Sequence, residues 1–363
     1  MKRIISLLLA LITLFSLCAC GSKNYAMKYE GVTLSQNEYL YWLSSYKAVF
    51  LSMYLANQDT DEAWSAVISD TGATVEDLLD GIARDNIKNN VVCLSLFDKL
   101  GLKLDKSATL EVETYINGLV EKAGGTAALD NALSAYGVDT KLLKQIYTNE
   151  KKIEKVKTVL FEDGGELALT YDEMNDHYKK AYVRVKHIYI NSIKDFARDD
   201  EGDLIIDSDT GSYKTRDLTD EEKAEKIALA KSINAELLAG GDFDELMAKH
   251  TADTTMKVYP GGYYVTTSSR LLPTALTEKA FGMNNGDTAY IESDIGIHII
   301  KREPLEDRAY EDEKLAAFFG DFKNNIMTGK LSEYLATLSP SVEVNEEIVD
   351  AFSIRTCTAN YSY

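Results

Sequence analysis

Histidine is the residue in this chain best suited to acid–base or hydrogen-bonding chemistry, and only four occur among 363 residues. His187 in "VKHIYI" and His298 in "SDIGIHIIKRE" lie inside alternating apolar runs that predict β-strands. In the second run Ile295, Ile297 and Ile299 fall on one face of the strand and His298 on the other. Taken alone, a histidine among isoleucines is most simply a hydrogen-bonded core residue. The pattern leaves open whether His298 also belongs to a reactive site.

The other candidate reactive groups favour structural roles. His177 is predicted to be a solvated helix residue, and His250 an exposed residue near a helix end. Cys93 lies on what reads as a buried helical face, with a disulfide to Cys357 as the alternative outside the cytoplasm. No His or Cys cluster has metal-binding spacing. The DxDxG run at 207–211 is rejected as a calcium loop, because its glycine comes one position early and no acidic residue closes it.

Sequence motifs for hydrolases and nucleotide enzymes are also missing. The chain has no GxSxG, no phosphate-binding loop, no HExxH and no GxGxxG after a strand. We therefore expect no metal and no cofactor.

The N-terminus predicts export and lipid anchoring. "MKR" is basic, "IISLLLALITLFSL" is apolar but short for a membrane span, and "LCAC" follows. This segment resembles the lipobox of bacterial lipoproteins, which implies removal of residues 1–19 and lipidation of Cys20. An ordinary secretory signal is the alternative. Each buried lipid methylene contributes about 0.8 kcal/mol, so the expected location is the extracytoplasmic face of the cell membrane, as in a Gram-positive bacterium.

The net charge restricts the partners. The whole chain carries a formal charge of −19, and loss of Lys2 and Arg3 with the signal peptide makes it more negative by two. Such a protein repels nucleic acid and anionic headgroups. We expect no nucleic-acid partner, and we expect the lipid to provide the membrane attachment.

Periodicity divides the remaining chain into helical and mixed regions, which together predict an α+β fold. Ser35, Thr74 and Thr219 each precede a helical pattern as an N-cap residue. The late helical region has no partner of its own, so it should dock on the first one. The expected organisation is a helical domain formed by both ends of the chain, with an inserted α/β domain that has a small, mostly antiparallel sheet. Its parts are a signal peptide (1–19), an N-terminal helical domain (20–179), the inserted domain (180–304) and a C-terminal helix and strand (305–363).

The inserted region is similar to the parvulin rotamase family. The shared blocks are "VKHIYI", then "GGDFDELMAKHTADTTMKVYPGGYY", then "LPTALTEKAFGMNNGDTAYIESDIGIHIIKRE", in the family's order over about 120 residues. The helical flanks resemble those of PrsA-type foldases and SurA-like chaperones, where a parvulin domain interrupts a helical chaperone domain. The resemblance implies peptidyl-prolyl cis–trans isomerase activity.

The resemblance also implies the site residues. Its catalytic positions correspond to His187, Asp253 and His298, with Asp253 near the substrate carbonyl. Its proline-pocket positions correspond to Leu272 and Leu276, supported by Phe281.

The sequence departs from the family pattern in four ways. Thr251 replaces a serine, and "GGYYV" replaces "GGDLG", which would put Tyr263 and Tyr264 near the rim of the cleft. Ile295 stands where some members have a small hydroxyl residue, so one hydrogen-bonding partner is expected to be missing. Leucines in the pocket remove a flat aromatic face and predict weakened activity.

Three functions remain open. The first is an extracytoplasmic, membrane-anchored foldase that isomerises X–Pro bonds in unfolded or partly folded secreted polypeptides. The second is a non-catalytic chaperone, or holdase, with a degenerate parvulin domain. The third is a lipoprotein with an adhesion or scaffolding role. A homodimer is left open by the sequence.

Overall fold

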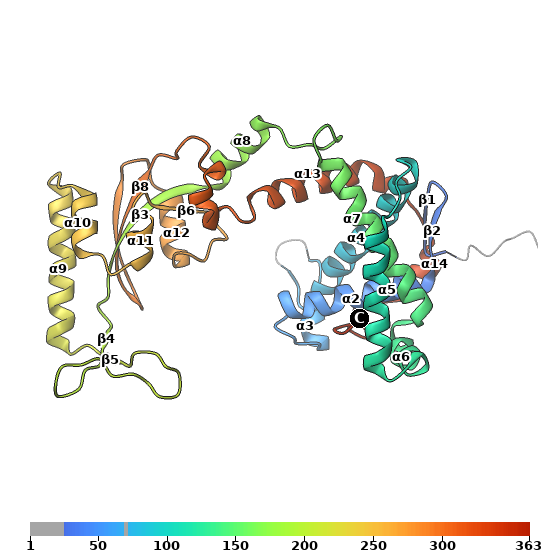
Figure 1. The fold of residues 1–363 in the computed structure, drawn as a ribbon, viewed down its shortest axis with the longest axis horizontal. Coiled ribbons are helices and arrows are strands. Elements are labelled where there is room, and N and C mark those ends of the chain that lie inside the picture. Colours follow the sequence, from blue (N-terminus) through green and yellow to red (C-terminus); the bar gives the residue numbers. More distant parts are fainter. Residues whose placement is uncertain (1–24, 69–71) are drawn as a thin grey trace, which may run out of the picture. The chain divides into compact units, whose positions relative to one another are not determined.

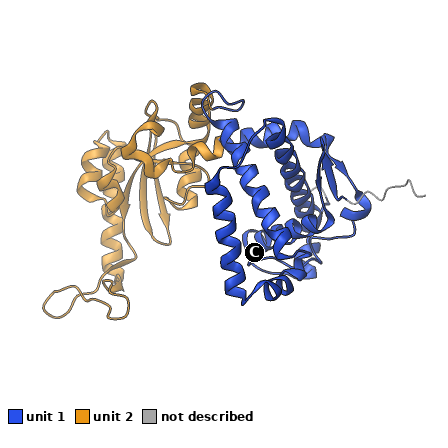
Figure 2. Ribbon diagram, turned by 45° about the vertical axis from the view of Figure 1, so that its right-hand side comes forward, with its two compact units in different colours: residues 1–168, 327–363 blue, residues 169–326 orange. Residues whose placement is uncertain are grey.

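The computed structural model describes residues 25–68 and 72–363, which form two compact units (Figure 2). Unit 1 comprises Met1–Ala168 and Met327–Tyr363, and unit 2 comprises Leu169–Ile326. A mainly helical unit built from both ends of the chain therefore encloses, in sequence, an inserted unit with a sheet, as expected for the predicted α+β fold. The predicted signal peptide and Cys20 lie outside the described residues.

Unit 1 is a group of helices with a three-stranded antiparallel sheet of order β2-β1-β9 (Figure 1). Its helices are α2 (Gln36–Met53), α3 (Asp61–Ser65), α4 (Val75–Lys99), α5 (Lys106–Ala123), α6 (Thr126–Leu133), α7 (Thr140–Phe161) and α14 (Glu346–Val349). Its strands are β1 (Met27–Tyr29), β2 (Val32–Leu34) and β9 (Glu343–Val344). Strands β1 and β2 form a hairpin, because Glu30 and Gly31 adopt positive φ and reverse the chain.

The helix starts in both units follow the predicted capping chemistry. Ser35, Thr74 and Thr219 each accept a hydrogen bond from the backbone N–H three residues later. The acidic side chain of that later residue in turn accepts from the backbone N–H of the capping residue. These reciprocal capping boxes satisfy N–H groups that a helix start otherwise leaves unpaired. Cys93 is buried as predicted, and both Cys93 and Cys357 are free thiols, so the alternative disulfide is not formed.

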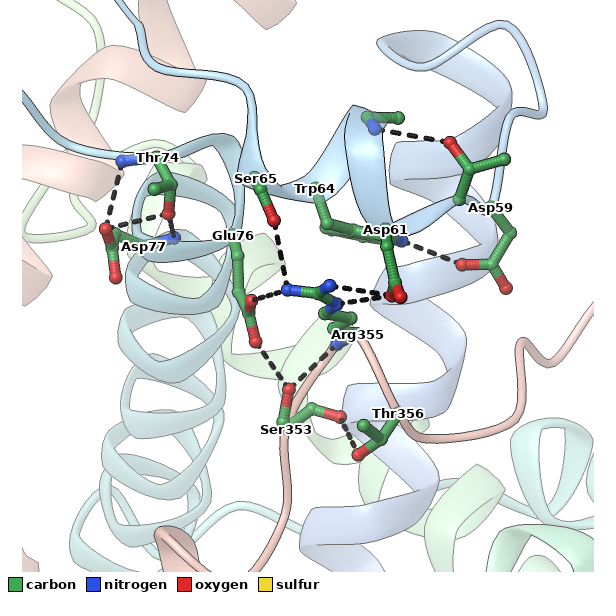
Figure 3. A network of polar contacts seen from close by, with 12 residues as sticks. Asp59, Asp61, Trp64, Ser65, Thr74, Glu76, Asp77, Ser353, Arg355 and Thr356 are labelled. Carbon is green, nitrogen blue, oxygen red and sulfur yellow. Dashed lines mark hydrogen bonds and ion pairs between the residues drawn. The ribbon is translucent and has the colours of Figure 1, made fainter.

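The C-terminal segment is held on unit 1 by a polar network (Figure 3). The guanidinium of Arg355 pairs with Asp61 on α3 at 2.7 Å and with Glu76 on α4 at 3.3 Å, and it donates to Ser65 Oγ at 3.2 Å. Ser353 Oγ donates to Glu76 at 2.7 Å. These bonds tie the C-terminal segment to α3 and α4, which lie far from it in sequence, so the last residues of the chain are part of the helical unit.

Unit 2 contains a four-stranded sheet of order β6-β3-β8-β7, and all three pairings are antiparallel. Its strands are β3 (Val183–Ile190), β6 (Tyr263–Val265), β7 (Thr288–Ser293) and β8 (Gly296–Glu303), and a separate hairpin pairs β4 (Lys194–Phe196) with β5 (Thr215–Asp217). Its helices are α8 (Tyr171–Ala181), α9 (Asp220–Leu238), α10 (Phe243–His250), α11 (Thr254–Val258) and α12 (Thr274–Phe281). Helix α13 (Phe322–Leu338) begins in unit 2 and continues into unit 1.

The chain after β8 adds an aromatic layer to unit 2. Two short 3-10 helices, η3 (Ala309–Glu311) and η4 (Glu313–Phe318), lead into α13. The ring of Phe318 lies 4.8 Å from that of Tyr259, between centroids, and about 6 Å from those of Tyr263 and Tyr264. Aromatic pairs of this kind stabilise the fold by more than the burial of their surface area alone provides. The core of this unit is therefore completed by residues that follow the sheet in sequence.

No helix among the described residues has both the length and the apolar character needed to cross a membrane.

Candidate active site

Three polar side chains meet inside unit 2. His187 Nδ1 lies 2.7 Å from Asp253 Oδ2, and His187 Nε2 lies 3.0 Å from His298 Nδ1. His187 is 4% exposed and His298 is 1% exposed, so neither ring faces solvent. The structure thus brings together the three residues that the family resemblance named as catalytic, in one buried hydrogen-bonded chain.

The register of two strands explains how the histidines meet. In the antiparallel pair β3–β8, His187 is opposite Ile300 and Tyr189 is opposite His298. The two histidines are therefore diagonal neighbours on one face, within reach of long side chains. Their rings lie 5.2 Å apart at an interplanar angle of 13°, and the Tyr189 ring stacks on His298 at 5.2 Å.

Thr251 places Asp253 against the histidine strand. The Thr251 hydroxyl accepts hydrogen bonds from the backbone N–H groups of Tyr189 (3.0 Å) and Asp253 (3.1 Å). Asp253 is also the N-cap of α11, where its Oδ1 accepts from the N–H groups of Thr255 and Met256. The threonine that replaces the family's serine keeps the hydroxyl that this turn requires.

Ser293 supplies the hydroxyl that was expected to be missing because of Ile295. Its Oγ lies 2.8 Å from His298 Nε2 and accepts from the N–H of Ile295 at 3.2 Å. Ile295 itself precedes β8, is 47% exposed, and contributes only backbone groups: this N–H and its carbonyl, which accepts from Tyr189 OH at 2.6 Å. The expectation that the network lacks a partner here is therefore wrong. The sequence feature that indicates Ser293 is the two-residue turn that pairs it with Gly296.

Tyr263 is a second participant that sequence reasoning misplaced. Its hydroxyl donates to Asp253 Oδ2 at 2.6 Å, and its side chain is buried, as is that of Tyr264. Neither tyrosine lies on an exposed rim, because β6 turns them toward opposite, covered faces of the sheet. The Tyr264 hydroxyl donates instead to Glu306 Oε2 at 3.0 Å.

The electrostatics fix the direction of the hydrogen bonds. Burial raises the pKa of Asp253, but hydrogen bonds from His187 and Tyr263 outweigh it and hold the pKa at about 2. Burial and the neighbouring His187 lower the pKa of His298 to about 4. With Asp253 ionised, His187 Nδ1–H must donate to it, which leaves Nε2 to accept from His298 Nδ1–H. His298 Nε2 then accepts from the Ser293 hydroxyl.

The expected pocket residues lie in the hydrophobic core of the same unit. Leu276 is fully buried and Leu272 is 5% exposed, while Phe281 is partly buried and packs against that core. Two cavities of about 510 and 310 Å³ lie beside Tyr264, and neither is lined by the three network residues or by these leucines. The network therefore lies below the surface and lines neither of these two cavities. The assignment of Leu272, Leu276 and Phe281 as a proline pocket stays a prediction.

The two remaining histidines do not join this network. His177 on α8 is partly buried rather than fully solvated, and its ring lies 5.6 Å from that of Phe322. His250 ends α10 and is also partly buried.

Comparisons with known proteins found one matching family model and several similar solved structures. Residues 175–304 match the family model of the PPIC-type PPIase domain. The chain is similar to the crystal structure of the foldase PrsA from Streptococcus pneumoniae at 16% identity, covering 78% of this chain and 97% of that one, with a TM-score of 0.25. It is similar to PrsA from Bacillus subtilis at 15% identity, covering 84% and 94%, with a TM-score of 0.23.

A SurA-like chaperone structure from Campylobacter jejuni shares 16% identity, with coverage of 82% and 99% and a TM-score of 0.20. The search of curated protein sequences gave no match. Residues 175–304 of this chain thus match a PPIC-type PPIase domain, the parvulin-type family that the sequence resembles.

Proposed function

We propose that this protein is an extracytoplasmic, membrane-anchored foldase that catalyses cis–trans isomerisation of X–Pro bonds in secreted polypeptides. The observation that carries the proposal is the complete hydrogen-bonded chain from Tyr263 through Asp253, His187 and His298 to Ser293. A domain retained only as a spacer has no need of five hydrogen-bonded polar groups, three of them buried and two partly buried, since burial of such groups without bonds is costly.

The reaction requires little beyond a shaped, dry surface. Rotation about the peptide bond is opposed by its partial double-bond character, with a barrier of about 18–20 kcal/mol, and an uncatalysed X–Pro bond takes tens to hundreds of seconds. The twisted state has lost amide resonance and carries less charge separation, so apolar walls stabilise it relative to the planar ground state. In this proposal Leu272, Leu276 and Phe281 form that wall, and the network fixes the strands behind it.

A non-catalytic holdase is the second candidate, and one observation favours it. The two leucines at the pocket positions are buried and offer no exposed aromatic face to a proline ring. A domain with this departure could still bind extended polypeptide without accelerating its isomerisation.

Exchange spectroscopy separates the two functions. We expect the purified chain beginning at Gly21 to accelerate cis–trans exchange in a panel of X–Pro peptides at least about tenfold, equivalent to about 1.4 kcal/mol of the barrier. His298→Ala should lose most of this rate, because Ser293 and His187 both lose their partner. The matched control is His250→Ala, which removes a partly buried histidine outside the network.

Two results would count against the enzyme. One is an exchange rate equal to that in buffer, and the other is an equal rate for wild type and His298→Ala. If the wild-type chain suppresses aggregation of an unfolded protein while its exchange rate equals that in buffer, the holdase is the function.

The anchor in this proposal is a lipid on Cys20. Its support is the "LCAC" segment after a short apolar run. We expect the wild-type protein in the membrane fraction of the producing cell and Cys20→Ala in the soluble secreted fraction. Recovery of both proteins in the membrane fraction would exclude the lipid anchor.

A further inference from the structure

The Asp253 carboxylate has no free acceptor site. Its Oδ2 accepts from Tyr263 OH at 2.6 Å and from His187 Nδ1 at 2.7 Å. Its Oδ1 accepts from the backbone N–H groups of Thr255 at 2.9 Å and Met256 at 3.2 Å. A carboxylate has about four lone-pair directions, and all four are used within the protein. Asp253 therefore acts through His187 rather than on a substrate carbonyl.

Tyr263 is the one side-chain hydroxyl among these four donors, and it is fixed in place. It lies on β6 opposite Val185, which precedes His187 on the same face of β3. Gly262, with φ of +113°, brings the chain so close to the Val185 carbonyl that a Cβ would lie 2.9 Å from its oxygen. The Tyr263 ring is packed by Phe318 at 6.0 Å, from the segment that follows the matched domain. The hydroxyl thus has a single placement.

In the family pattern "GGDLG", an acidic residue stands where "GGYYV" has Tyr263. A second carboxylate at this buried position would repel Asp253, whereas a phenol donates a hydrogen bond to it. The substitution therefore exchanges a potential repulsion for a specific contact.

We propose that Tyr263 is a positioning residue of the isomerase site, whose hydroxyl holds the Asp253 carboxylate so that His187 keeps its proton on Nδ1. The effect of Tyr263 on isomerisation rests on the proposed function, whereas its effect on the His187 tautomer does not. With the proton on Nδ1, His187 Nε2 is free to accept from His298, and the bond direction continues to Ser293. Without the phenol, Asp253 Oδ2 keeps only the bond from His187, and the carboxylate loses its second donor at that oxygen.

Protonation of Asp253 is the event that Tyr263 opposes. The groups facing this carboxylate are His187 from β3 and Tyr263 from β6, with His298 from β8 behind His187. The charge of Asp294, in the β7–β8 turn, raises the pKa of His298. Removing the Tyr263 hydroxyl leaves the burial that raises the pKa of Asp253 and removes one bond that lowers it. The pKa of Asp253 must therefore rise, and the carboxylate loses its charge at a higher pH.

The test compares Tyr263→Phe with Tyr264→Phe, using the chain beginning at Gly21 with nitrogen-15-labelled histidine. Both variants remove one buried hydroxyl from β6, but the Tyr264 hydroxyl bonds to Glu306, outside the network. Imidazole nitrogen shifts report the tautomer of His187 and His298 as a function of pH. For Tyr263→Phe we expect the acid transition of Asp253, seen as the change it causes in the His187 tautomer, to move upward by about one pH unit, equivalent to one lost hydrogen bond. The X–Pro exchange rate should fall in the same variant.

Tyr264→Phe should leave the tautomers and the acid transition as in wild type. A double-mutant cycle adds a second criterion: in an Asp253→Asn background, Tyr263→Phe should produce no further change in exchange rate. Equal pH profiles for the two phenylalanine variants, or fully additive effects in the cycle, would overturn the positioning role. If the tautomer shift occurs in a chain that does not isomerise X–Pro bonds, the proposed function fails and the positioning role stands.

Discussion

Replacing His187 by alanine is expected to abolish isomerase activity and to lower the stability of unit 2 by about 3–5 kcal/mol. His187 is the only described residue bonded to both Asp253 and His298. Its removal leaves a buried carboxylate short of a partner, leaves the Nδ1–H of His298 without an acceptor, and opens a cavity between β3 and β8. Each of these changes is destabilising, and all three act at one place.

Native-state hydrogen exchange of the β3 and β8 amides measures this effect in unit 2 alone, since the chain has two units and need not unfold in one step. The control is His250→Ala, at the end of α10. His187→Gln provides a milder change, because an amide can donate to Asp253 and accept from His298. We expect it to recover part of the stability. A loss below about 1 kcal/mol in His187→Ala would show that the network contributes little to folding.

Gly296→Ala is expected to be the most damaging single-methyl change near the site. Gly296 has φ of +147°, and a Cβ there would lie 2.7 Å from the Ile190 carbonyl oxygen and 2.7 Å from Tyr189 Cε2. The oxygen belongs to the backbone of β3, and the tyrosine ring is held by its bond to the Ile295 carbonyl and by stacking on His298. Neither can move freely. Backbone strain and overpacking together predict a loss of about 3–5 kcal/mol.

The matched control is Gly286→Ala in the turn before β7. Gly286 also has positive φ, +91°, but a Cβ added there would meet no atom within 4 Å, so only backbone strain applies. We expect a loss of about 1–2 kcal/mol there. Thermal unfolding and hydrogen exchange of the β8 amides give both values, and the imidazole shifts of His298 report whether the Tyr189 ring has moved. Similar losses for both glycines would contradict the close contact at Gly296.

Local sequence determined the secondary structure and much of the architecture. The caps at Ser35, Thr74 and Thr219, the burial of Cys93, and the alternating runs around His187 and His298 follow from rules that act within a few residues. The order of helical, mixed and helical segments was also sufficient to predict an inserted unit. The pairing of the two histidines came from family resemblance, because nothing local links residues that are 111 positions apart.

Only the tertiary structure decided which other groups complete the site. Ser293 reaches His298 because a two-residue turn folds β7 back on β8, while Ile295, in the position the sequence pointed to, faces outward. Tyr263 reaches Asp253 because β6 pairs with β3 in one particular register, and Phe318 covers it from a segment beyond the family domain. Register and long-range packing depend on the whole core. A one-residue slip turns every side chain to the opposite face, so spacing along the chain alone could not place these groups.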